Sequence, residues 1–115
     1  MSLDFCLERK FTYEDGEKGS NEIFWANITH NLNKMAEKAG IYEVLWHPYR
    51  INVEKAWQAI PIIEEGLKKL KANPDYYQQF DSPNGWGLYI HFVPFVEKVL
   101  KACQENPNAD IRTST

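Results

Sequence analysis

Apolar and polar residues alternate at the start of the chain, where Leu3, Phe5 and Leu7 are followed by Asp, Cys and Glu respectively. A repeat of two residues is typical of a strand with one buried face, so we expect the fold to begin with a strand. The charged, glycine-containing stretch 14–21 indicates an exposed hairpin loop. Residues 22–26 favour strand formation and predict a short second strand that leads directly into a helix.

The spacing of apolar residues then changes from two to three or four. This period predicts a helix over 28–39 with one apolar face. Gly40 can adopt a left-handed conformation without a Cβ clash and therefore predicts the end of this helix. Pro48 restricts the residue before it and ends any short helix in the stretch 41–47. The apolar face of the predicted helix consists of Ile28, Leu32, Met35, Ala36 and Ala39.

Two longer helical repeats follow. The first, over 52–70, predicts a helix that Asn52 can cap and in which Pro61 requires either a kink or a restart. Pro74 favours the start of a short helix, and the stretch 81–87 has the proline, asparagine and glycines of a loop. The second long repeat predicts a helix over 88–104. The last apolar residues, around Ile111, are compatible with an edge strand against the first one.

These elements predict a single α+β domain over residues 1–115. We expect a small antiparallel sheet, made by the amino-terminal hairpin and extended by a carboxy-terminal strand, packed on three main helices. A chain of 115 residues with 43% hydrophobic residues is large enough for one core. No apolar run approaches the roughly 20 residues of a membrane helix, and the amino terminus lacks the apolar region of a signal peptide. We therefore expect a cytoplasmic protein with reduced thiols, in which Cys103 belongs to the core.

Charge and motif content narrow the range of functions. A net charge of -3 opposes binding to nucleic acid by phosphate neutralisation, which needs clustered lysine and arginine. The three histidines and two cysteines do not form a metal-binding motif, so we expect neither metal nor cofactor. Thr29 and His30 are adjacent and would point about 100° apart on a helix, which prevents them from acting as a catalytic pair. A small hydrolase or metal-dependent enzyme is therefore the third-ranked interpretation.

One polar stripe lies beside the apolar face of the first predicted helix. Asn27, His30, Asn31 and Lys34 share this stripe, which offers hydrogen-bond donors and acceptors with little fixed charge. Such a set can hold a polar ligand or tie down a neighbouring loop. The alternative is that the stripe is solvated, or that Asn27 or Thr29 caps the helix while the others bond to the backbone.

A second candidate group lies in the loop 81–87. Asn84 and Trp86 are close to glycines, which let the backbone approach a ligand. If this loop docks over the polar stripe, with Trp46 at the edge, the result is a pocket of amides, imidazole and indole. Arg50 and Lys34 would then supply positive charge for a phosphate or carboxylate. The alternative interpretation places Trp25 and Trp57 in the core and makes Asn84 a brace for its own loop.

Three stretches carry a resemblance to known proteins. ANITHNLNKMAEKAGIYEVLW, NGWGLYIHFVPFVEKVLKAC and NADIRTS, with the NITHNL, LWxP and NGWG spacing, resemble a family of small uncharacterised proteins encoded by bacteriophages and prophages. The similarity extends from Phe24 to the end of the chain. It implies a phage origin and a fold, and it implies no chemistry.

Together these observations predict a non-enzymatic phage accessory protein in the cytoplasm of the bacterial host. We expect it to bind or sequester a small polar ligand, such as a nucleotide, between the first helix and the NGWG loop. The alternative is a protein-binding module that inhibits a host factor. Neither nucleic acid nor membrane is an expected partner, and a homo-oligomer is left open.

Overall fold

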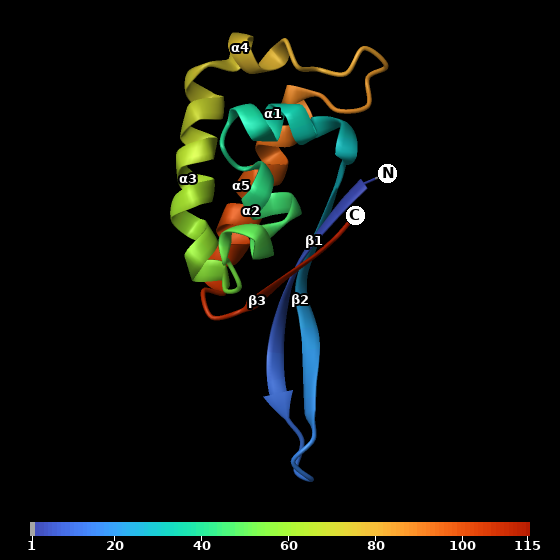
Figure 1. Cartoon of the computed structure of the whole chain (residues 1–115), viewed down its shortest axis with the longest axis vertical. Coiled ribbons are helices and arrows are strands. Elements are labelled where there is room, and N and C mark those ends of the chain that lie inside the picture. Colours follow the sequence, from blue (N-terminus) through green and yellow to red (C-terminus); the bar gives the residue numbers. More distant parts are fainter. Residues whose placement is uncertain (1) are drawn as a thin grey trace.

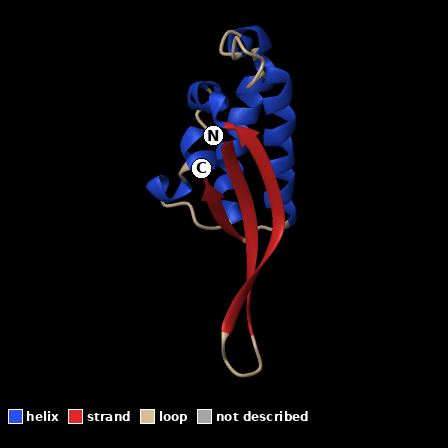
Figure 2. Ribbon diagram, turned by 90° about the vertical axis from the view of Figure 1, so that its right-hand side faces the viewer, coloured by secondary structure: helices blue, strands red, loops and turns tan. Residues whose placement is uncertain are grey.

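The computed structural model describes residues 2–115. It has the predicted α+β fold, with a three-stranded sheet and helices gathered on one of its faces (Figures 1 and 2). No helix within residues 2–115 is long and apolar enough to cross a membrane. The strands are β1 (Ser2–Thr12), β2 (Lys18–Thr29) and β3 (Asp110–Ser114). The helices are η1 (His30–Leu32), α1 (Asn33–Lys38), α2 (Tyr42–Trp46), η2 (Pro48–Ile51), α3 (Ala56–Ala72), α4 (Pro74–Gln78) and α5 (Tyr89–Glu105).

The sheet has the order β2-β1-β3 and both pairings are antiparallel. The amino-terminal hairpin and the carboxy-terminal edge strand are therefore confirmed. The predicted boundaries of the second strand and first helix were wrong, because β2 covers Lys18–Thr29 and only Asn33–Lys38 is α-helical. Pairing of Ile28 with Leu3 holds this segment in the sheet, and these tertiary contacts override the local helical period.

The core lies between one face of the sheet and the helices. Leu3, Phe5 and Leu7 alternate along β1 and are completely buried against this helical layer. The long helices α3 and α5 pack against each other and supply further core residues, among them Phe92 and the predicted Cys103. Burying a side chain of the size of Leu or Phe contributes roughly 1.5–3 kcal/mol, so this alternation fixes the register of β1.

The helices differ from expectation at one cap, and each of the two longest helices contains a proline. The helix α3 continues through Pro61 without a restart, and α5 likewise contains Pro94. Asn52 does not cap α3, because it has a φ of 58° and ends η2 instead. The Gln58 side chain accepts hydrogen bonds from the backbone N–H groups of Glu54 and Lys55 at the start of α3.

The outer part of the β1–β2 hairpin extends beyond the helices as a two-stranded arm (Figure 1). The pairing of β1 with β3 ends at Glu8, whereas its pairing with β2 continues to Thr12. At this boundary Leu7 pairs with Phe24 and Glu8 with Glu22, so Ile23 forms a β-bulge. The arm accounts for much of the molecule's 54 Å length.

Candidate functional site

The polar residues after β2 and the loop between α4 and α5 meet in space. The Asn31 Nδ2 donates a hydrogen bond of 2.7 Å to the Trp86 carbonyl oxygen. Next to this bond, Gly87 has a φ of 120°, and a Cβ placed there would lie 3.0 Å from the Asn31 Cβ. Glycine is therefore required both by the backbone conformation and by the close approach of the two segments.

The loop is also held from within. The Asn84 Oδ1 accepts hydrogen bonds from the Trp86 N–H, at 2.9 Å, and from the Ser82 hydroxyl. A further bond of 2.7 Å joins the Tyr89 N–H to the Asp81 carboxylate where α5 begins. Asn84 thus does brace its own loop through its oxygen, while its Nδ2 has no hydrogen-bond partner within residues 2–115.

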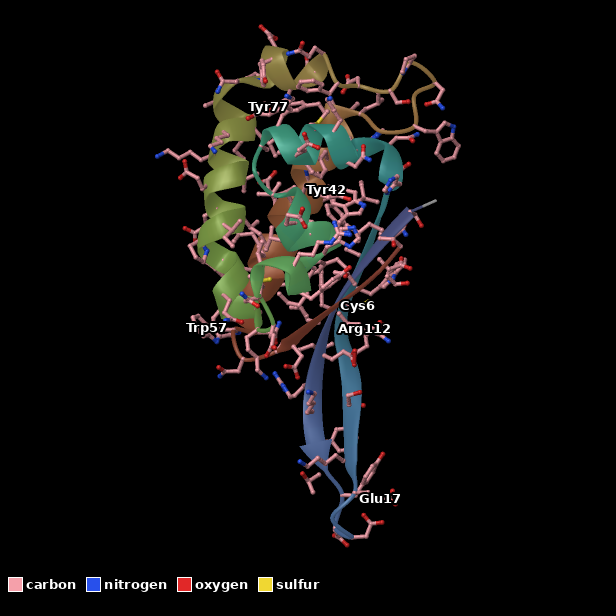
Figure 3. The ribbon with its side chains drawn as sticks, viewed as in Figure 1. Cys6, Glu17, Tyr42, Trp57, Tyr77 and Arg112 are labelled. Atoms are coloured by element: carbon pink, nitrogen blue, oxygen red, sulfur yellow. The ribbon has the colours of Figure 1, made fainter. Side chains whose placement is uncertain are left out.

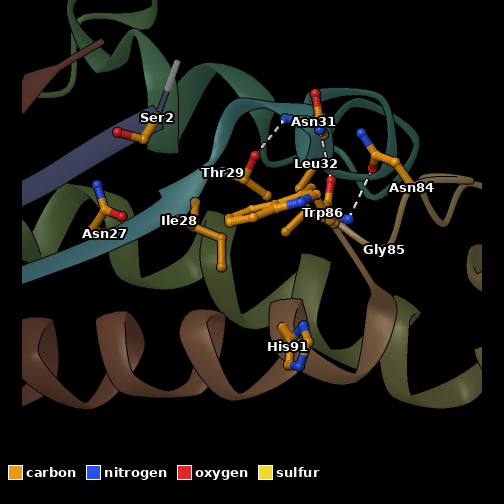
Figure 4. A pocket seen from close by; sticks show the side chains of 11 residues that line it. Ser2, Asn27, Ile28, Thr29, Asn31, Leu32, Asn84, Gly85, Trp86 and His91 are labelled. Carbon is orange, nitrogen blue, oxygen red and sulfur yellow. Dashed lines mark hydrogen bonds between the residues drawn. The ribbon is translucent and has the colours of Figure 1, made fainter.

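A groove with a volume of about 850 Å³ runs between the end of β2 and this loop. Figure 4 shows side chains from both segments, together with His91 from α5, around this groove. The Trp86 side chain is 70% exposed, so its indole is available for contact with a ligand. The lining consists of Ser2, Asn27, Ile28, Thr29, Asn31, Leu32, Asn84, Gly85, Trp86, Gly87 and His91.

The groove combines polar side chains with a largely apolar surface, and His91 is the one imidazole among its described residues. The lining residues that the structure describes include no lysine, arginine, aspartate or glutamate. The Asn27 Nδ2 donates to the Leu3 carbonyl and to the Asp4 carboxylate, at 3.2 and 2.8 Å, which fixes this amide beside the groove. An amide can both donate and accept, so three amides around an indole can recognise a polar ligand with a flat face.

Of the eight predicted site residues, four line the groove and four do not. His30 and Trp46 form a structural pair, in which the Trp46 Nε1–H donates to the His30 Nδ1 at 3.2 Å. An indole nitrogen can only donate, so the His30 Nδ1 must be the acceptor. Trp46 is only 1% exposed, and therefore belongs to the core rather than to the edge of a pocket. Asn27, Asn31, Asn84 and Trp86 are the four that line the groove.

The two predicted cations lie outside the groove lining. Arg50 is 3.9 Å from the Glu43 carboxylate and its guanidinium lies 5.9 Å from the centre of the Tyr49 ring. Lys34 is exposed on α1 and is not a lining residue. The expected cationic anchor for a phosphate or carboxylate is therefore absent from the described lining.

Sequence reasoning missed two lining residues of the groove and misplaced two tryptophans. His91 lies on the first turn of α5, four residues beyond Gly87. This short separation in sequence could have indicated that His91 lies close to the loop. Ser2 reaches the groove because it pairs with Thr29 across the sheet, which the chain order does not reveal. The two tryptophans expected in the core, Trp25 and Trp57, are instead each 55% exposed.

Neither thiol has the character of a nucleophile. Burial raises the pKa of Cys103 to about 12. Burial is also the main cause that raises the pKa of Cys6 to about 11, assisted by the neighbouring Glu22 carboxylate and opposed by Arg112. Figure 3 shows Cys6 and Arg112 at the middle of the sheet. Within residues 2–115, no three His, Cys, Asp or Glu side chains are grouped closely enough to hold a metal ion.

Comparison of the chain with protein-family models, with curated proteins and with solved structures gives no match.

Proposed function

We propose that the groove between β2 and the loop 81–87 binds a small, neutral, polar ligand with a flat face, such as a nucleoside or its base. The observation that carries this proposal is the 2.7 Å hydrogen bond from Asn31 to the Trp86 carbonyl. This bond joins two segments that are 55 residues apart in sequence and that line the same groove.

The composition of the groove supports this ligand class over an anion. An indole provides an apolar face for stacking, which contributes about 1–3 kcal/mol for a nucleic-acid base. The Asn84 Nδ2 as a donor, and the Asn27 and Asn31 side-chain oxygens as acceptors, can recognise the edge of such a ring by hydrogen bonds. A phosphate would need charged or backbone donors, and the lining residues within 2–115 include no lysine or arginine.

The role we propose is sequestration rather than turnover. Among the described lining residues His91 is the one imidazole, and no carboxylate or cysteine lies beside it in the lining. General acid–base or nucleophilic chemistry needs such a partner. The resemblance to small phage and prophage proteins suggests where this would matter, namely as an accessory function in an infected bacterial cell.

The test is to incubate the purified protein with a metabolite extract, purify it again, heat it and identify the released material by mass spectrometry. We expect near-stoichiometric release of an unaltered neutral aromatic metabolite. Trp86→Ala should weaken binding of that compound by about 10–100-fold, as loss of one stacking contact implies. Trp57→Ala is the matched control, since it removes an equally large exposed indole from α3, away from the groove.

Three results would contradict the proposal. Chemically altered material would indicate an enzyme. Release of nothing would exclude a tightly held small ligand, and equal binding by the wild type and Trp86→Ala would place the site elsewhere.

A second candidate function, a protein-binding module that inhibits a host factor, is favoured by the exposure of Trp25 and Trp57. Exposed aromatic side chains are enriched at protein interfaces. Retention of one host protein by the wild type, its loss with Trp25→Ala and the absence of released metabolite would favour this function.

A further inference from the structure

The outer part of the arm is acidic, whereas Arg9 and Lys10 at its base are cationic. Residues 11–22 contain one lysine and four carboxylates, and so have the same net charge of -3 as the whole chain. The remainder of the molecule is therefore neutral overall. Figure 3 places Glu17 at the far end of the arm. The carboxylates of Glu14, Asp15 and Glu17 have no ion-pair partner within residues 2–115.

The end of the arm is ordered by its own contacts. The Tyr13 N–H donates to the Glu17 carbonyl at 2.6 Å, and the Gly16 N–H donates to the Tyr13 carbonyl at 2.9 Å. The Phe11 and Tyr13 rings meet edge to face with centres 4.9 Å apart. The Phe11 ring also covers Gly19, where an added Cβ would lie 2.7 Å from it. The acidic turn is thus presented on a defined support, which reduces the entropy lost on binding.

One edge of this arm is open. The strand β3 covers β1 only from Asp4 to Glu8, so residues 9–12 of β1 have a strand partner on one side only within the described chain. An open edge presents unpaired backbone N–H and C=O groups and is a template for another strand. A two-stranded ribbon by itself is only marginally stable in water, so a third strand would stabilise it.

A charged groove lies beside the base of the arm. It has a volume of about 520 Å³, and its lining includes the cations Arg9, Lys10 and Lys55 and the carboxylates Glu105 and Asp110. Asp110 in this groove already accepts from Lys55, at 2.6 Å, and lies 3.6 Å from Lys10. Arg9 has no carboxylate partner within residues 2–115 and donates only a long bond of 3.5 Å to the Asn106 side chain.

We infer that the arm binds a second copy of this chain. In the dimer, the two β1 edges pair antiparallel around a twofold axis near Lys10 and Phe11. Such antiparallel pairing brings the end of each arm to the base of the other, because the four steps from Arg9 to Tyr13 cover about 13 Å of strand. The acidic turn of each copy then faces Arg9 and Lys10 of its partner. The same contact between an acidic turn and a cationic base then forms twice, as a closed twofold interface requires.

The size of the arm sets the expected strength. An interface limited to two arms and two small grooves lies at the lower end of the roughly 1,200–2,000 Å² that stable complexes bury. We therefore expect dissociation constants on the order of micromolar, with dimers weakened by added salt because the contacting charges are exposed.

The experiment is sedimentation equilibrium of the full chain at low and high salt, with two charge-reversed variants. Glu14→Lys with Asp15→Lys and Glu17→Lys reverses the turn, and Arg9→Glu with Lys10→Glu reverses the base. Each variant alone should dimerise at least about tenfold more weakly than the wild type. An equimolar mixture of the two should recover a dimer containing one copy of each. Lys98→Glu with Lys101→Glu, on the exposed side of α5, is the control and should leave dimerisation unchanged.

Circular dichroism establishes that each variant is folded. Zero-length cross-linking of the unmodified wild type provides a second measurement, in which we expect links between the acidic turn and Lys10 or Lys55 of the partner. A wild-type chain that stays monomeric at low salt and about 0.5 mM would overturn the inference. So would a dimer that both reversals leave unchanged, or a monomer whose arm instead retains a basic protein of the host.

Discussion

The two ends of the β1–β2 ribbon differ in what surrounds them. At one end, the strands lie against the helices, η1 and the loop 81–87, and Leu3 and Phe5 are completely buried. At the other end, beyond Glu8, the same two strands continue without helices against them, and only Arg9 and Lys10 at the base contact the rest of the described chain, at Asn106 and Asp110. Phe11 continues the alternation of Phe5 but meets only Tyr13 and Gly19 of the arm itself. The strand pattern alone therefore does not decide what is core; the covering layer does.

The largest expected effect separates these two ends directly. Phe5→Ala should reduce the free energy of unfolding by about 3–5 kcal/mol, because it removes a completely buried ring and leaves a cavity. Phe11→Ala, the same change in the arm, should cost about 1 kcal/mol or less, since that ring makes only local contacts. Urea unfolding followed by circular dichroism measures both. Equal losses would show that the arm is part of the cooperative core.

An intermediate effect is expected where the loop closes on the covered end. Gly87→Ala places a Cβ against Asn31 and in a backbone region that other residues rarely adopt, at a cost of about 1–3 kcal/mol. It should also weaken ligand binding, because the added Cβ would push the loop 81–87, one wall of the groove, away from Asn31. Gly16→Ala is the matched control: its φ of 89° carries a similar strain, but a Cβ there meets nothing within 4 Å and Gly16 is not a lining residue of the groove. Retained binding in Gly16→Ala and lost binding in Gly87→Ala would identify the contact with Asn31 as the cause.

The smallest effect is expected where the base of the arm meets β3, at the ion pairs of Asp110. The hydrogen bond from Lys55, with a smaller contribution from Lys10, lowers the pKa of the Asp110 carboxyl from its ordinary value of 3.8. A carboxyl whose pKa is lowered by folding adds stability above that ordinary value, and this stability is lost as the pH falls through the folded-state pKa. Because the pair is partly exposed, the contribution should be below about 1 kcal/mol.

Unfolding of the wild type and of Lys55→Met, measured from pH 7 down to pH 3, tests this junction. The difference between the two proteins should be greatest near neutral pH and should decrease towards pH 3. Lys98→Met serves as a control without this partner. A difference that is constant over the whole range would assign the effect of Lys55 to packing instead of charge.

The sequence was sufficient for the order of elements and for the identity of the sheet, because the repeats of two and of three to four residues are local properties. It was insufficient at the start of η1, where Ile28 fits a helical face equally well but is held in β2 by Leu3. The meeting of Asn31 with Trp86 could be proposed from the glycines in the loop. The pairing of His30 with Trp46 could not, since it depends on how α2 packs beneath η1.

The bulge at Ile23 gives the hairpin a natural point of division. On the outer side of it, the backbones of the two strands pair in matched steps of one residue from each strand. The hairpin can therefore be shortened or lengthened in evolution, or by design, by paired deletion or insertion beyond Glu8 and Glu22, while every residue that forms the core and the groove keeps its place. The length of the arm and the composition of the groove can therefore change independently of each other.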